Sequence, residues 1–129
     1  MSLRGVLDVV LTDPGMASVV QHAGAAQLAV TAPPSVQPLV AAALAARRPG
    51  GAAVPVLVVT AGERDADALA SVLRCFVPDS RVEVFPAWET LPHARLSPRA
   101  DTVGRRLAVL RDLTPVSYTH LTLPTILRV

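Results

Sequence analysis

The stretch from Val54 to Thr60 constrains the fold more than any other part of this 129-residue chain. It reads Val-Pro-Val-Leu-Val-Val-Thr, so apolar side chains fall on both faces of the strand that it predicts. A strand of this kind is typical of the centre of a parallel sheet, where helices cover both sides. Pro55 fits the first residues of such a strand, where no ladder donor is lost. We therefore expect an α/β domain organised around this strand.

Helical patterns lie on both sides of this strand. Apolar residues at helical spacing, with breakers between them, predict helices over 3–12, 14–22, 36–48, 63–76 and 102–113. Asp13, Ser35 and Asp101 are the expected N-caps, because short polar side chains accept the first free amides of a helix. In the last helix, four residues are expected to face the core and three to face solvent: Val103, Leu107, Leu110 and Leu113 inside, and Arg105, Arg106 and Arg111 outside.

Two further segments are expected to be strands: 27–31, which is a short apolar run, and 81–85, in which polar and apolar residues alternate. Strands that alternate with helices imply right-handed crossovers and a three-layer fold with a parallel sheet. In such a sheet, the loops that follow the strands carry any ligand site. Here those loops are 32–35, 61–63 and 86–100.

The first of these loops, Ala32-Pro33-Pro34-Ser35, stands where a phosphate-binding loop would stand. Such a loop needs glycines, so that its amides can surround a phosphate, and a lysine that reaches the outer phosphates. Pro33 and Pro34 have no amide hydrogen, and all twelve basic residues of the chain are arginine. We expect no nucleotide to bind here.

Composition excludes several other classes of function. The twelve arginines and ten carboxylates are scattered singly, and 3% aromatic residues leave few platforms for stacking bases, so no nucleic-acid stripe is predicted. One cysteine and three histidines lack metal-ligand spacing, so neither a metal site nor an internal disulfide is expected. No signal peptide is recognisable, and Val54–Thr60 is too short to span a membrane, so we expect a cytoplasmic protein.

No catalytic constellation emerges from the sequence. Glu89 lies near Trp88 and His93, but a loop carboxylate is usually solvated or caps a helix, and His93 has no nucleophile arranged with it. Cys75 falls on the apolar face of a helix beside Phe76, where a small buried thiol is the ordinary explanation.

Trp88, the only tryptophan, stands in a proline-rich loop. It is either a lid over the core, the more common place for a large ring, or an anchor for another domain or protein. Glu89, Arg95, Arg105 and Arg106 would then share an interdomain surface with it.

Residues 116–129 stand apart from the rest of the chain. They begin Val-Ser-Tyr-Thr-His-Leu-Thr-Leu-Pro-Thr, which resembles the in-frame translation of a sequencing adapter, and they bring the only Tyr into the sequence. We expect this tail not to be native and to take no part in the fold, so that residues 1–115 are the N-terminal part of a longer domain. The alternative is a genuine short strand.

Three motifs together carry a family resemblance. Pro86-Ala87-Trp88-Glu89-Thr90-Leu91-Pro92, then Leu96-Ser97-Pro98, then Asp101-Thr102-Val103-Gly104-Arg105-Arg106-Leu107 resemble the signature of bacterial transcription-repair coupling factors. The match runs in order from Gln21 to about Leu113 and falls near the start of the module that is similar to the B component of the bacterial excinuclease.

The resemblance implies a DNA translocase that uses ATP and Mg to displace stalled RNA polymerase and that recruits the A component of the excinuclease. It also implies that this chain is part of a helicase-like, RecA-like domain with a degenerate phosphate loop, and that the sites for ATP, DNA, RNA polymerase and the excinuclease lie outside these residues. Its partners here would be the remaining domains of the same protein, with no membrane, metal or cofactor. The alternatives are a free-standing P-loop-like nucleotide-binding protein and a fragment of the excinuclease B component itself.

Overall fold

The computed structural model describes residues 2–89, 97–113 and, for the backbone only, 125–128. The chain divides into two compact units, of which the first consists of residues 1–82 with 124–129 and the second of residues 83–123.

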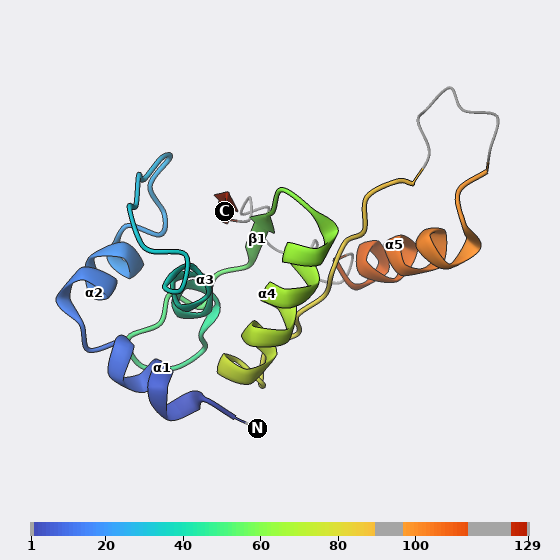
Figure 1. Cartoon of the computed structure of the whole chain (residues 1–129). Coiled ribbons are helices and arrows are strands. Elements are labelled where there is room, and N and C mark those ends of the chain that lie inside the picture. The colour runs from blue at the N-terminus through green and yellow to red at the C-terminus, as the bar shows by residue number, and fades with distance from the viewer. Residues whose placement is uncertain (1, 90–96, 114–124, 129) are drawn as a thin grey trace. The chain divides into compact units, whose positions relative to one another are not determined.

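In the first unit the other elements surround one buried helix, α3 (Gln37–Ala45). This helix contacts α1 (Arg4–Val10), α2 (Pro14–Gln21), α4 (Glu63–Phe76) and β1 (Val56–Val59) (Figure 1). All its residues from 40 to 44 are buried, and the central three are alanines. Side chains this small let neighbouring backbones approach closely, and a helix that is apolar on all sides must be covered on all sides.

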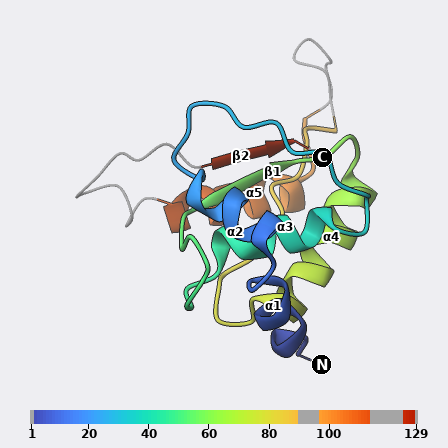
Figure 2. The same cartoon turned by 90° about the vertical axis from the view of Figure 1, so that its left-hand side faces the viewer.

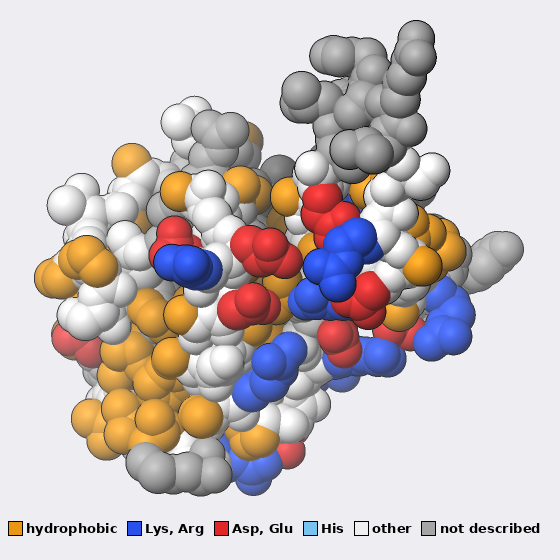
Figure 3. All heavy atoms as spheres, turned by 45° about the vertical axis from the view of Figure 1, so that its right-hand side comes forward, with side chains coloured by type: hydrophobic (Ala, Val, Ile, Leu, Met, Phe, Trp, Pro, Cys, Tyr) orange, Lys and Arg blue, Asp and Glu red, His pale blue; other side chains and the backbone are white. Residues whose placement is uncertain are grey.

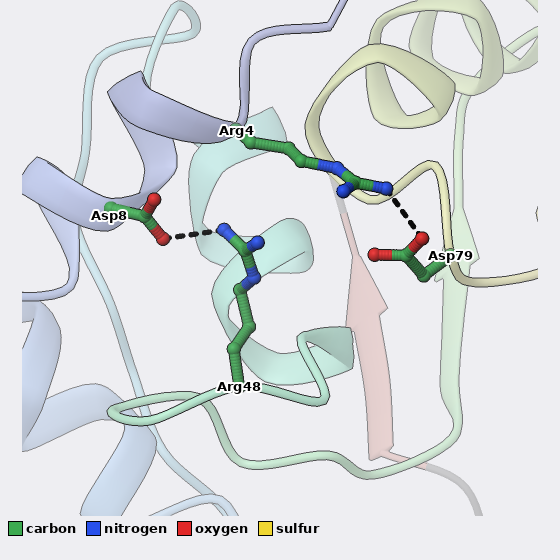
Figure 4. A network of polar contacts seen from close by, with 4 residues as sticks. All are labelled: Arg4, Asp8, Arg48 and Asp79. Atoms are coloured by element: carbon green, nitrogen blue, oxygen red, sulfur yellow. Dashed lines mark hydrogen bonds and ion pairs between the residues drawn. The ribbon is translucent and has the colours of Figure 1, made fainter.

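Helix α1 supplies the most deeply buried large side chain, and two ion pairs attach it to neighbouring segments. Leu7 is 0% exposed and lies in the core with Leu11. Arg4 pairs with Asp79, in the turn after α4, and Asp8 pairs with Arg48, in the loop after α3, each at 2.5 Å between nitrogen and oxygen (Figure 4). All four side chains are partly exposed, so each pair adds at most about 1 kcal/mol to stability.

Helix α2 begins as the sequence predicts. Asp13 is its N-cap, with an extended backbone, and its Oδ2 accepts a hydrogen bond from the Met16 amide at 3.0 Å. Pro14 occupies the first turn, where its missing amide hydrogen costs nothing. The helix ends at Gln21, one residue before its predicted end at residue 22.

Helix α3 differs from its prediction at both ends. Its N-cap residue is Val36, without a side-chain cap, and not Ser35, and it ends at Ala45 rather than at Arg48. Pro38 lies in its first turn, where a missing amide hydrogen is tolerated. The early end is explained by the extended backbone of Ala46, which frees Arg48 to reach Asp8.

Helix α4 spans Glu63–Phe76, as predicted, with Glu63 and Asp65 in the first turn, where carboxylates favour the helix dipole. It packs against α3 and α1 and buries Ala70 and Phe76. From the last turn of this helix, Arg74 donates a hydrogen bond to the Val82 carbonyl at 2.9 Å. This bond fixes the last residue of the first part of the unit, 1–82, to α4.

Strand β1 confirms that a strand forms within Val54–Thr60, although only its central residues pair. The expected burial on both faces is wrong, because Leu57 and Val59 are exposed while Val56 and Val58 are half-buried. Its neighbour is β2 (Thr125–Arg128), parallel to it, with Val56 opposite Thr125 and Val59 opposite Arg128 (Figure 2). Our expectation that the tail takes no part in the fold is therefore wrong for residues 125–128. The foreign origin of residues 116–129 stays a prediction.

The expected strands at 27–31 and 81–85 do not form, although both segments lie in the described part of the chain. A strand exists only through ladder hydrogen bonds to a neighbour, and apolar composition alone does not provide one. In the described residues the sheet consists of β1 and β2. The three-layer, RecA-like fold thus stays a prediction.

The second unit contains α5 (Ala100–Leu113), preceded by the irregular segment 83–89. Asp101 lies in the first turn of this helix and is not its N-cap, because the helix begins one residue earlier. The predicted inner face is wrong: Leu107, Leu110 and Leu113 are 50 to 61% exposed, and Thr102 is the buried residue. The helix instead turns Thr102 and Arg106 toward the segment 83–89.

The turn that joins α3 to β1 requires glycine at one position for reasons of space. A Cβ atom on Gly51 would lie 2.4 Å from the Ala46 carbonyl oxygen, which is backbone and cannot move aside cheaply. The turn also holds Gly50 at a φ of 83° and Ala53 at a φ of 54°, so it is already strained by Ala53 in the left-handed region.

We predict that Gly51→Ala lowers the free energy of unfolding of the first unit by about 1–3 kcal/mol, the usual cost of overpacking. Gly24→Ala is the matched control, because a Cβ there meets nothing within 4 Å. Denaturant melts followed by far-UV circular dichroism measure both. Equal stability of the two variants would show that the turn can open without cost.

Candidate functional site

Segment 83–89 is fixed onto α5 by a small set of polar and ring contacts within the second unit. Phe85, Pro86, Trp88 and Glu89 contribute from the segment, and the helix side contributes Arg99, Thr102 and Arg106. We call these residues the loop–helix latch.

Arg106 is the centre of the loop–helix latch. Its guanidinium carbon lies 3.9 Å from the ring centroid of Phe85 and 4.3 Å from that of Trp88. One of its terminal nitrogens donates a hydrogen bond to the Pro86 carbonyl. A guanidinium over an aromatic face is worth about 0.5–1 kcal/mol where water can reach it, so two rings and a carbonyl hold this side chain in one orientation.

Glu89 forms the second part of the loop–helix latch. Its Oε1 accepts a hydrogen bond from the Thr102 hydroxyl, and its Oε2 accepts one from the Arg99 amide at 3.2 Å. The amide of Arg99 is one that the start of α5 leaves without a helical partner, so Glu89 caps this helix from a distant position. The capping alternative for Glu89 is thus confirmed.

These contacts lower the pKa of Glu89 below its ordinary value. The hydrogen bond from the Thr102 hydroxyl is the largest cause, and the amide and positive charge of Arg99 add to it, while partial desolvation acts in the opposite direction. Glu89 is therefore an acceptor fixed in its ionised form, which suits a structural role rather than a general acid.

Trp88 is 50% exposed, and Phe85 is 43% exposed. The core-lid interpretation predicts a mostly buried ring, and the exposure of Trp88 favours the anchor interpretation. Arg106 was expected to face solvent on its helix, and this is wrong, since its side chain is half-buried and packs on the two rings. The anchor interpretation grouped Arg106 with Trp88, and the two side chains are in contact. Arg105 is exposed, as expected.

The other candidate residues do not join this site. Arg95 and His93 lie outside the described residues, as does His120. His22 is bonded to its own helix, with Nδ1 2.7 Å from the Ser18 carbonyl oxygen. Cys75 is half-buried, with Sγ 3.5 Å from the Ser71 carbonyl oxygen, so its predicted burial is confirmed only in part.

Loop 32–35 leads into a turn that is closed by the amide of the next residue. The Val36 amide donates to the Pro33 carbonyl at 2.9 Å, and Pro33 and Pro34 have no amide hydrogen to offer. Ser35 is exposed and does not cap α3. Ala32 is half-buried.

Acidic and arginine side chains lie next to one another on the face that Figure 3 shows, so neither sign of charge gathers alone in this view. Within residues 2–89 and 97–113, no helix is long and apolar enough to cross a membrane.

Because Trp88 is the only tryptophan, its fluorescence reports on the loop–helix latch. We predict that Arg106→Ala weakens the attachment of the segment by about 1–3 kcal/mol, shifts the emission to longer wavelength and increases quenching by acrylamide. Arg105→Ala is the control, since Arg105 is the exposed neighbour on the same helix. An unchanged emission in Arg106→Ala would show that the rings do not depend on this guanidinium.

The lowered pKa of Glu89 gives a pH dependence of defined sign. A carboxylate with a depressed pKa in the folded state stabilises that state above its unfolded pKa, and this contribution is lost as the pH falls through the folded pKa. We predict a change in Trp88 emission with a midpoint below about 4.3, the ordinary value for Glu. In Glu89→Gln this transition should be absent, and in Glu83→Gln it should persist. A midpoint at or above the ordinary value would contradict the hydrogen-bonded arrangement.

The comparisons with known proteins agree with the motifs that surround the loop–helix latch. The chain is 47% identical over 113 residues to the transcription-repair-coupling factors of Mycobacterium bovis and Mycobacterium tuberculosis. Each match covers 86% of this chain and 9% of the relative, so the chain spans less than a tenth of the length of these relatives. No protein-family model matches the chain, and no solved structure does. The resemblance predicted from the tryptophan motif is thus confirmed, and the chain belongs to the transcription-repair-coupling factors, as a stretch that corresponds to 9% of their length.

Proposed function

We propose that these residues form a non-catalytic module of a transcription-coupled repair factor, and that the module holds a surface against other domains of the same protein. The observation that supports this proposal is the loop–helix latch, which fixes the segment 83–89 while Trp88 stays 50% exposed. Half-exposed tryptophans on ordered segments are frequent anchors of protein interfaces. Because the segment is already ordered, little conformational entropy is lost when a partner docks.

The absence of a nucleotide site in this module is part of the proposal. Loop 32–35 follows the position of a predicted strand, but two of its residues are proline, and the chain has no lysine to reach a phosphate. The ATP and Mg that the whole protein uses are therefore held by other residues of the longer protein.

The role of the whole protein is proposed from the family. Proteins called transcription-repair-coupling factors join transcription to repair, and we propose that the longer protein is an ATP-dependent DNA translocase that displaces stalled RNA polymerase and recruits the A component of the excinuclease. In this proposal the present module restrains the motor and does not contact DNA. An interdomain surface also accounts for apolar side chains that α5 leaves exposed, such as Leu107.

We predict that Trp88→Ala raises basal ATP hydrolysis severalfold in a hybrid in which residues 1–113 of this chain replace the matching segment of the Mycobacterium tuberculosis relative. Loss of the anchor frees the motor from its restraint, and Trp88→Phe, which keeps an aromatic ring, should retain more of that restraint. Hydrolysis without DNA is the measurement, and far-UV circular dichroism of the 129-residue chain checks that the substitution leaves the fold intact.

Two results would contradict the proposal. In one, Trp88→Ala lowers the free energy of unfolding of the chain by about 3–5 kcal/mol, the cost of truncating a buried ring, and leaves basal ATP hydrolysis unchanged. In the other, millimolar ATP raises the melting temperature of the 129-residue chain by several degrees, as linkage requires for a real nucleotide site.

A further inference from the structure

The guanidinium of Arg106 has more hydrogen-bonding capacity than its contacts use. A guanidinium carries five N–H donors, and the contacts of the described residues show one hydrogen bond from it, to the Pro86 carbonyl. Its guanidinium carbon lies over the ring faces of Phe85 and Trp88. The N–H donors of a guanidinium lie in its plane, in a fork that matches the two oxygens of a carboxylate.

Arg106 has no carboxylate partner among the described contacts of this chain. Glu89, the acidic residue of the loop–helix latch, gives its two oxygens to Thr102 and Arg99. An arginine that is held in one orientation and lacks an anionic partner is preorganised to bind one, because its side-chain entropy has already been lost.

We propose that Arg106, packed on Phe85 and Trp88, binds the carboxylate of one Asp or Glu side chain from another domain of the longer protein. This inference rests on the proposed interdomain function and identifies the chemistry of the contact. The half-exposed rings of Phe85 and Trp88 would receive apolar side chains that neighbour the acidic residue. The pair would be charge-assisted and bidentate, the geometry in which arginine recognises carboxylates best.

The charge around the site favours a single carboxylate over a nucleic acid. Among residues 83–89 and 97–113 there are as many acidic as basic side chains: Glu83, Glu89, Asp101 and Asp112 against Arg99, Arg105, Arg106 and Arg111. A phosphate backbone needs several cations in a row and would meet these carboxylates. One carboxylate flanked by apolar side chains meets the guanidinium and the two rings.

The lysine-free composition of the chain allows a direct test. Arg106→Lys introduces the only side-chain amine of the segment, and a zero-length carbodiimide reagent joins an amine only to a carboxylate in direct contact. In the hybrid with the Mycobacterium tuberculosis relative, we expect Lys at this position to be cross-linked to one Asp or Glu outside residues 1–113, identified by mass spectrometry. Arg105→Lys, one residue away and exposed, is the matched control and should not give that product.

A second measurement needs no substitution. A dione reagent that modifies arginine should react severalfold more slowly with Arg106 in the hybrid than in the 129-residue chain, while Arg105 reacts equally in both. Equal reactivity of Arg106 in the two proteins, or a cross-link only to acidic residues within 1–113, overturns the proposal. If Trp88→Ala still raises the basal rate of ATP hydrolysis in that case, the interdomain function stands and only the proposed carboxylate site is wrong.

Discussion

The close packing of small side chains along α3 is the contact on which the first unit depends. A helix whose residues 40–44 are all buried can be covered only if other elements reach it from several directions, and α1, α2, α4 and β1 do so. Ala42 and Ala43 are 0% exposed, which leaves no room for a larger side chain at either position. The aliphatic, ring-poor composition of the chain follows from this arrangement, because alanine and valine fill the narrow gaps between helices.

The two units are stabilised by different kinds of interaction. In the first, burial of aliphatic side chains supplies most of the stability, and the polar contacts at its surface are exposed ion pairs and helix caps. In the second, the described contacts are mainly a guanidinium on aromatic rings and a carboxylate that accepts hydrogen bonds from the start of α5. Contacts of the second kind fix the orientation of side chains but add little to the free energy of unfolding. Such an arrangement suits a recognition surface better than a core.

The sequence predicted those parts that depend on near neighbours in the chain. Asp13 and Pro14 indicate the start of α2, and the run around Val56 indicates β1, because caps and apolar runs act over a few residues. The segments 27–31 and 81–85 also have strand-like patterns, one apolar and one alternating, but they form no strand, since pairing depends on a partner that composition does not specify. Arg106 was grouped with Trp88 only in the anchor interpretation. Its contacts with the Phe85 ring and the Pro86 carbonyl were not predicted, because no spacing rule connects an arginine on a helix with a loop about twenty residues earlier.

Helix α1 shows how a few exposed charges can fix the rotation of a short helix about its own axis. Val6 and Val9 face outward while Leu7 faces the core, so burial of aliphatic area alone discriminates weakly between alternative rotations of this helix. Arg4 and Asp8 stand one turn apart, in positions to pair with each other, yet each pairs instead with a different neighbouring segment. Turning the helix about its axis would break both pairs at once, so these charges set its rotational registry, as polar residues do in coiled coils, at almost no gain in stability.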